Sequence, residues 1–94
     1  MKVVLKVLLP ALPEAIGGSD LEVDLIGKTI NDVIEFLIAQ YGKSAKKALL
    51  NDDGKLDPMI QILLNGKEWV AHDQLDMNLQ DGDSLFFMVM MAGG

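Results

Sequence analysis

The residues with the clearest chemical potential are the two glycines that end the printed sequence, Gly93 and Gly94. A terminal carboxylate that follows two residues without side chains can enter a narrow channel and take backbone angles that other residues avoid. The glycines come directly after an uncharged run, residues 84–92, whereas chain ends are usually polar and frayed. We therefore predict that Gly94 offers its carboxylate as a reacting group.

The rest of the sequence offers little other chemistry. The chain has no cysteine, which excludes disulfides, a thiolate nucleophile and a cysteine-based metal site. His72 is the single histidine, and no serine or cysteine constellation surrounds it, so an exposed loop position is the favoured interpretation. The acidic residues at 73, 76, 81 and 83 lack the spacing of a calcium loop and are expected to be solvated and to form turns. We predict no catalytic residue, no metal site and no bound cofactor.

The composition is typical of one small folded domain that spans residues 1–94. Half of the residues are hydrophobic, as in globular rather than disordered chains. The net charge of −6 argues against a nucleic-acid partner, because phosphate binding needs clustered Lys and Arg. The longest apolar run, residues 85–92, is far shorter than the roughly 20 residues that cross a bilayer. We expect a cytoplasmic protein without a nucleic-acid or membrane partner.

Hydrophobic periodicity predicts four to five strands and one main helix. Apolar side chains recur at helical spacing over residues 30–41, between a capping-box-like start at 29–32 and a closing glycine, Gly42. Residues 44–50 are predicted to form a second, short helix. Asn65-Gly66 is a strong hairpin signal, and Trp69, just after it, is expected to pack against the sheet edge or the helix. The predicted strands are residues 2–9, 20–25, 59–64, 67–70 and 84–90.

The order of these elements predicts an α+β fold of the β-grasp type. Two strands precede a helix that crosses to further strands, which indicates a mixed sheet with the helix across one face. In this arrangement the first and last strands lie parallel at the centre. One long helix can cover only one side of such a sheet.

The last predicted strand is apolar on both faces, so one set of its side chains is left uncovered. An exposed apolar surface on a small domain usually marks a partner site, and methionines adapt well to such surfaces. The sequence does not decide which face is covered. The predicted docking residues are Phe86, Phe87, Met88, Met90 and Met91. The alternative is that a connection such as residues 10–19 folds over them.

Asp81-Gly82-Asp83, followed by an apolar strand and Ala92-Gly93-Gly94, resembles the sulfur-carrier branch of the ubiquitin-like proteins, the ThiS/MoaD-like family. Its members include the small subunit of molybdopterin synthase and the thiamin-pathway sulfur carrier. The order of the helix, the hairpin at 62–67, the turn and the tail is also similar to the family's. The tail lacks the proline pair common in the molybdopterin type, since Val89 and Met90 stand there. The extra segment 43–58, however, resembles that type.

The resemblance implies a reaction cycle at a protruding tail, at about residues 90–94. A ubiquitin-activating-type adenylyltransferase would use ATP to adenylate the Gly94 carboxylate, because a free carboxylate is a poor acyl electrophile. Ala92 and Gly93 would thread the tail into that enzyme. A sulfur donor with a persulfide would then give a thiocarboxylate, and an acceptor synthase subunit or biosynthetic enzyme of the molybdopterin, tungstopterin or thiamin type would take the sulfur.

In this interpretation the chain is a carrier and co-substrate, or the small subunit of a synthase, and has no catalytic residues of its own. Two alternatives stay open. In the first alternative, the chain is a ubiquitin-like modifier that is joined to lysines through Gly94. In the second, it is a β-grasp binding module whose terminal glycines do not react.

Overall fold

The computed structural model describes residues 1–8 and 20–89. The predicted tail, with Met90, Met91, Ala92, Gly93 and Gly94, lies outside the described residues, as does the connection 10–19. The described elements are β1 (Lys2–Leu8), β2 (Asp20–Asp24), α2 (Ile30–Tyr41), α3 (Lys43–Leu49), β3 (Ile60–Leu64), β4 (Glu68–Val70) and β5 (Ser84–Val89).

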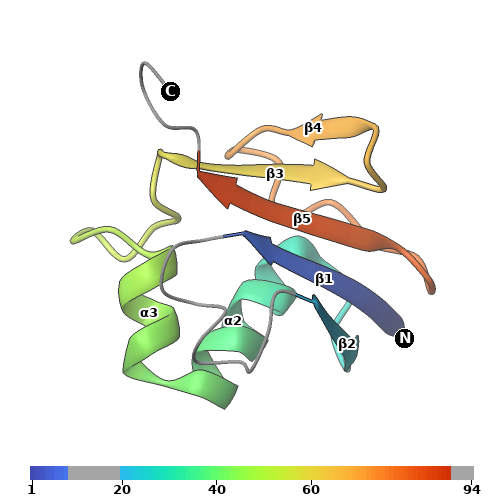
Figure 1. Cartoon of the computed structure of the whole chain (residues 1–94), viewed down its shortest axis with the longest axis horizontal. Helices are drawn as coiled ribbons and strands as arrows, with labels where there is room; N and C mark the ends of the chain where they lie inside the picture. Colours follow the sequence, from blue (N-terminus) through green and yellow to red (C-terminus); the bar gives the residue numbers. More distant parts are fainter. Residues whose placement is uncertain (9–19, 90–94) are drawn as a thin grey trace.

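The five strands form one mixed sheet in the order β2-β1-β5-β3-β4. β1 and β5 pair in parallel, and the other neighbours pair antiparallel. The first and last strands are therefore parallel neighbours inside the sheet, as predicted. Both helices lie on one face of the sheet (Figure 1), which confirms the predicted α+β arrangement.

The main helix begins at a capping box formed by Thr29 and Asp32. Thr29 Oγ1 accepts a hydrogen bond from the Asp32 backbone N–H at 3.2 Å, and Asp32 Oδ2 accepts from the Thr29 N–H at 3.0 Å and the Lys28 N–H at 2.8 Å. The backbone donors of Lys28 and Thr29, followed by the Thr29 side chain, lower the pKa of Asp32 below its ordinary value of 3.8. At the other end, Gly42 has a φ of +66° with a ψ of −138°, a combination that only glycine takes without strain.

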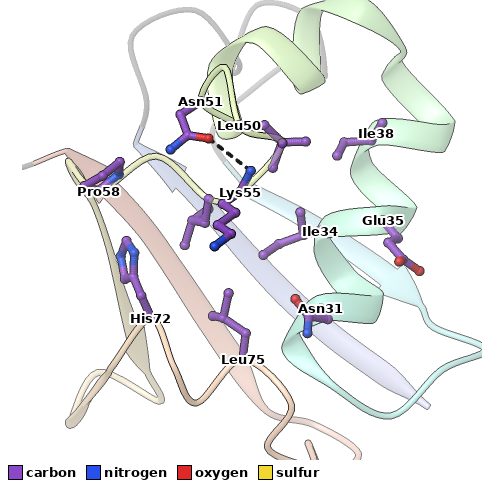
Figure 2. A pocket seen from close by; sticks show the side chains of 12 residues that line it. Asn31, Ile34, Glu35, Ile38, Leu50, Asn51, Lys55, Pro58, His72 and Leu75 are labelled. Carbon is purple, nitrogen blue, oxygen red and sulfur yellow. Dashed lines mark hydrogen bonds between the residues drawn. The ribbon is translucent and has the colours of Figure 1, made fainter.

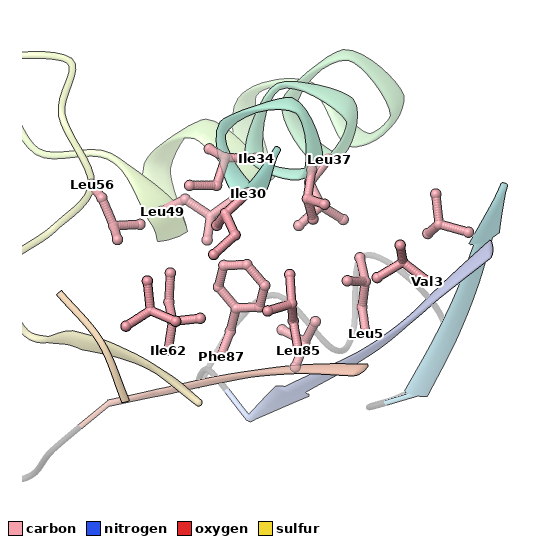
Figure 3. Packing of buried hydrophobic residues seen from close by; sticks show 14 of the residues in the cluster. Val3, Leu5, Ile30, Ile34, Leu37, Leu49, Leu56, Ile62, Leu85 and Phe87 are labelled. Atoms are coloured by element: carbon pink, nitrogen blue, oxygen red, sulfur yellow. The ribbon is translucent and has the colours of Figure 1, made fainter. Parts of the chain in front are cut away.

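The hydrophobic core lies between α2 and the sheet (Figure 3). Alternate residues of each strand point toward the helix, as Val3, Leu5 and Val7 do in β1, where all three are fully buried. The inward face of α2 meets this layer with the apolar side chains that its helical spacing predicts. The buried residues of α2 are Ile30, Val33, Ile34 and Leu37.

The remaining elements also agree with the sequence, with small shifts at their ends. The short helix α3 covers Lys43–Leu49 and buries Ala45 and Leu49. The hairpin turn has a φ of +55° at Asn65 and +70° at Gly66, the left-handed pair that Asn-Gly favours. In the described part of the chain, neither helix is long and apolar enough to cross a membrane.

Candidate functional site

The strand that leads to the tail, β5, has one buried face and one open face. Leu85 and Phe87 are fully buried, whereas Phe86 and Met88 are partly exposed. The structure therefore places Phe86 and Met88 on the uncovered side of the sheet. The prediction that Phe87 docks a partner is wrong, because its ring packs in the core beneath α2.

The open face of the sheet carries a continuous row of large side chains around Phe86. Phe86 is paired with Lys6 of β1 on one side and with Leu63 of β3 on the other. Leu63 is in turn paired with Trp69 of the edge strand β4. In the row nearer to the tail, Met88 lies beside Leu8. We call the following set the open apolar patch: Leu8, Leu63, Trp69, Phe86 and Met88.

Trp69 and Leu8 are patch residues that the sequence did not reveal. Trp69 is 58% exposed and Leu8 is 54% exposed. Trp69 lies on the edge strand, which agrees with one of the two predicted positions. It faces away from the helices, so the alternative prediction that it packs against the helix is wrong. Its neighbour Val70 turns into the core instead. Large apolar side chains left this exposed indicate a partner surface.

Charged residues border the patch on the side of β1 and β2. The Lys6 ammonium lies 5.3 Å from the centre of the Phe86 ring, within the range of a cation–π contact. Lys6 is paired across the strands with Asp20, and Lys2 Nζ lies 3.8 Å from Glu22 Oε1. The charged side chains thus lie over β2 and the first part of β1, whereas the apolar patch covers β5, β3, β4 and Leu8 at the end of β1.

The turn before β5 fixes where this strand starts. Asp81 Oδ1 accepts a hydrogen bond from the Lys2 N–H at 2.6 Å, and Asp83 Oδ2 accepts from the Gln80 N–H at 2.8 Å. Asp83 Oδ1 also accepts from Asn65 Nδ2 at 3.0 Å. These two carboxylates therefore form the turn, as predicted, and anchor β5 to β1 and to the hairpin.

His72 lies exposed in the loop after β4, as predicted. Its Nε2 donates a hydrogen bond to the Ile60 carbonyl oxygen at 2.7 Å, a contact that the sequence did not suggest. Within residues 1–8 and 20–89, no group of three or more His, Cys, Asp or Glu side chains is placed to hold a metal ion.

The sequence model of the Urm1 family, described as Urm1 (Ubiquitin related modifier), matches residues 17–94. The chain belongs to this family. A relative in Archaeoglobus fulgidus, described as a sulfur carrier protein, is 35% identical over 83 residues, which are 88% of this chain and 93% of the relative.

Solved structures of similar chains agree with this Urm1-family assignment. SAMP1 from Haloferax volcanii superimposes with a TM-score of 0.79 and 26% identity, over 100% of both chains. A chain of the BexX/CysO complex of Amycolatopsis orientalis superimposes with a TM-score of 0.68 and 26% identity, over 98% of this chain and 99% of that one. The predicted ubiquitin-like β-grasp fold and the resemblance to ubiquitin-related sulfur carriers are thus confirmed.

Proposed function

We propose that this Urm1-family protein is a sulfur carrier whose Gly94 carboxylate is activated by a partner enzyme. The observation that carries the proposal is the open apolar patch on β5, the strand that ends at Val89 and continues into the tail. A partner that covers Phe86 and Met88 is by necessity held beside the start of that tail. The five residues 90–94 span at most about 17 Å when extended, so the activating site lies within that distance of the end of β5.

The proposed reaction begins with attack of a Gly94 carboxylate oxygen on the α-phosphorus of ATP, which releases pyrophosphate and leaves an acyl-adenylate. The terminal sulfur of a persulfide on the sulfur donor then attacks the acyl carbon, and AMP leaves. A thiol of the partner then attacks the donor's sulfur in the resulting acyl disulfide. This attack joins the partner and the donor by a disulfide and releases the thiocarboxylate. This chain supplies only the carboxylate, because it has no cysteine.

The partners in this proposal are an adenylyltransferase of the ubiquitin-activating type, the sulfur donor and an acceptor. The acceptor is a synthase subunit or another biosynthetic enzyme of the molybdopterin, tungstopterin or thiamin type. A complex with a partner is in keeping with the solved BexX/CysO complex, which contains a chain of the same fold. ATP binds to the partner, and this chain is the co-substrate rather than the catalyst.

Intact-mass measurement tests the proposal. After incubation with ATP, a cognate activating enzyme and a persulfide donor, the mass is expected to rise by the difference between one sulfur and one oxygen atom. The Gly94 deletion variant is expected to keep its mass under the same conditions. An unchanged full chain, with an activating enzyme shown to be active on another carrier, contradicts the proposal.

The family's description as ubiquitin-related modifiers favours a second candidate function. The same acyl-adenylate would then be attacked by the amine of a lysine on another protein, which forms an isopeptide bond to Gly94 and releases AMP. Peptides in which a lysine carries a remnant of this chain's tail, ending at Gly94, are the expected evidence for this function when they are found in cells that express this chain and are absent with the Gly94 deletion.

A further inference from the structure

A cavity of about 530 Å³ opens beside α2 (Figure 2), and no residue of the open apolar patch lines it. It lies between α2, the connection at residues 50–58 and the loop after β4. Its apolar lining comes from all three of these segments. The apolar residues that line it are Ile34, Ile38, Leu50, Leu56, Pro58 and Leu75.

Lys55 lies across the middle of this cavity, among the apolar side chains (Figure 2). Its backbone N–H donates to Asn51 Oδ1 at 3.1 Å, which holds the loop in place. Among the described residues, no carboxylate lies within ion-pair distance of its ammonium. Glu35 is the one acid in the lining, and its side chain points away from Lys55 in Figure 2. The centre of the cavity therefore presents an unpaired cation over an apolar floor.

One wall of the cavity is close to the point where the chain leaves the sheet. His72 lines the cavity, and its Nε2 donates to the Ile60 carbonyl oxygen at 2.7 Å. Ile60 is paired with Val89 in the β3–β5 ladder. One hydrogen bond and one strand pairing thus separate the cavity wall from the last described residue of β5.

We propose that this cavity binds the chain's own C-terminal segment, residues 90–94, with the Gly94 carboxylate paired to the Lys55 ammonium. The segment has the complementary chemistry, because it carries two methionines and no charge apart from its terminal carboxylate. Methionine side chains adapt to irregular apolar surfaces such as this floor. Five extended residues reach at most about 17 Å, and they start from Val89, whose strand partner Ile60 is hydrogen-bonded to His72 in the cavity wall.

The weakness of the site favours the tethered tail over a free ligand. An exposed ion pair contributes only about 0–1 kcal/mol, and Lys55 lies at the surface. A free peptide would bind with so small a favourable free energy that it would need a high concentration to occupy the cavity. A segment joined by a short linker is present at an effective concentration of roughly millimolar. The same weak contacts therefore hold the tail in place and still release it to a partner.

The docking of the tail does not depend on the proposed sulfur-carrier function. The effect of docking on activation, however, rests on that proposed function. A docked tail must leave the cavity before an activating enzyme can take the carboxylate. The fraction of docked molecules would then reduce the apparent affinity for that enzyme.

Amide chemical shifts of the full chain and of a variant that lacks residues 90–94 test the docking without any partner enzyme. Shift differences are expected at the cavity, at Leu50, Lys55, Leu56, His72 and Leu75. The peptide Met-Met-Ala-Gly-Gly, added at millimolar concentration to the shortened chain, is expected to move the same signals, and its C-terminal amide is expected to move them far less. Differences confined to the neighbours of Val89 in β1 and β3 overturn the proposal.

The Lys55→Gln variant of the full chain is a second and independent test. It is expected to lose most of the tail-dependent shift differences in the cavity. Lys67→Gln removes the same charge from the hairpin turn at the other end of the sheet and is expected to keep them. If the two variants show the same tail-dependent shift differences, Lys55 does not pair with the Gly94 carboxylate. Because mass analysis of the thiocarboxylate is a separate measurement, failure of the docking leaves the proposed function standing, and the reverse also holds.

Discussion

Three hydrogen bonds join Asn65 to Ser84. The Asn65 N–H donates to the Ser84 carbonyl oxygen at 2.8 Å, and Asn65 Oδ1 accepts from the Ser84 N–H at 2.8 Å and from the Ser84 hydroxyl at 3.4 Å. Asn65 belongs to the β3–β4 turn and Ser84 is the first residue of β5. One side chain therefore both shapes the hairpin and sets where the tail-bearing strand begins.

Replacing Asn65 with alanine is expected to lower the free energy of unfolding by roughly 2–3 kcal/mol. Alanine at a positive φ costs about 1–2 kcal/mol, and the exposed side-chain hydrogen bonds to Ser84 and Asp83 together contribute about 1 kcal/mol. Urea unfolding followed by circular dichroism measures the change. Lys67→Ala in the same turn is the matched control and is expected to change the free energy by less than about 0.5 kcal/mol. If both variants unfold at the same urea concentration, Asn65 does not hold the turn.

The two adjacent phenylalanines of β5 are expected to respond in opposite ways to replacement. Phe87→Ala removes a fully buried ring and is expected to cost about 3–5 kcal/mol of unfolding free energy. Phe86→Ala removes a ring from the open face and is expected to cost less than about 1.5 kcal/mol. Thermal and urea unfolding of the two variants give the comparison. A greater loss for Phe86→Ala would mean that the two faces of β5 are assigned the wrong way round.

The capping carboxylate of Asp32 is expected to make stability depend on acid pH. Its pKa is lowered in the folded state, so its stabilising contribution is complete at pH values above the ordinary 3.8 and is lost as the pH falls through the lower, folded-state pKa. Asp32→Asn removes this titration. The urea midpoint of the wild type is therefore expected to fall more steeply than that of the variant as the pH is lowered below 3.8. Parallel curves for the two proteins would show that the carboxylate does not act as the cap.

Features set by local sequence were predictable here. The capping box at Thr29 and Asp32 needs only residues three apart, and the Asn65-Gly66 turn needs only the tolerance of these two residues for positive φ. The parallel pairing of β1 with β5 also followed, because the element order leaves few ways to cover one sheet face with one helix.

Features decided by packing were not predictable. Phe86 and Phe87 are chemically identical neighbours in a strand without polar markers, and only the position of α2 decides which ring is buried. Trp69 lies in a strand of three residues, too short for alternation to show its direction. The cavity joins Lys55 and His72 from two separate loops, and no spacing in the sequence indicates that they line one space.

Trp69 is expected to contribute to partner binding and little to folding. It is the largest exposed side chain of the open apolar patch, and tryptophans are enriched among the residues that dominate interface energies, with typical losses of about 2 kcal/mol or more on truncation. Trp69→Ser is therefore expected to raise the KM of the activating enzyme for this chain at least roughly 10-fold, which corresponds to about 1.4 kcal/mol. The rate of thiocarboxylate formation at saturating carrier is expected to stay the same.

The matched control for Trp69→Ser is a surface change outside the patch, Lys47→Gln on α3, which is expected to leave the KM unchanged. Urea unfolding of both variants is expected to resemble that of the wild type, because neither side chain belongs to the core. A normal KM for Trp69→Ser, with a raised KM for Lys47→Gln, would move the docking surface from the open sheet face to the helix side. A fall in stability for Trp69→Ser would instead mean that its ring supports the fold of β4.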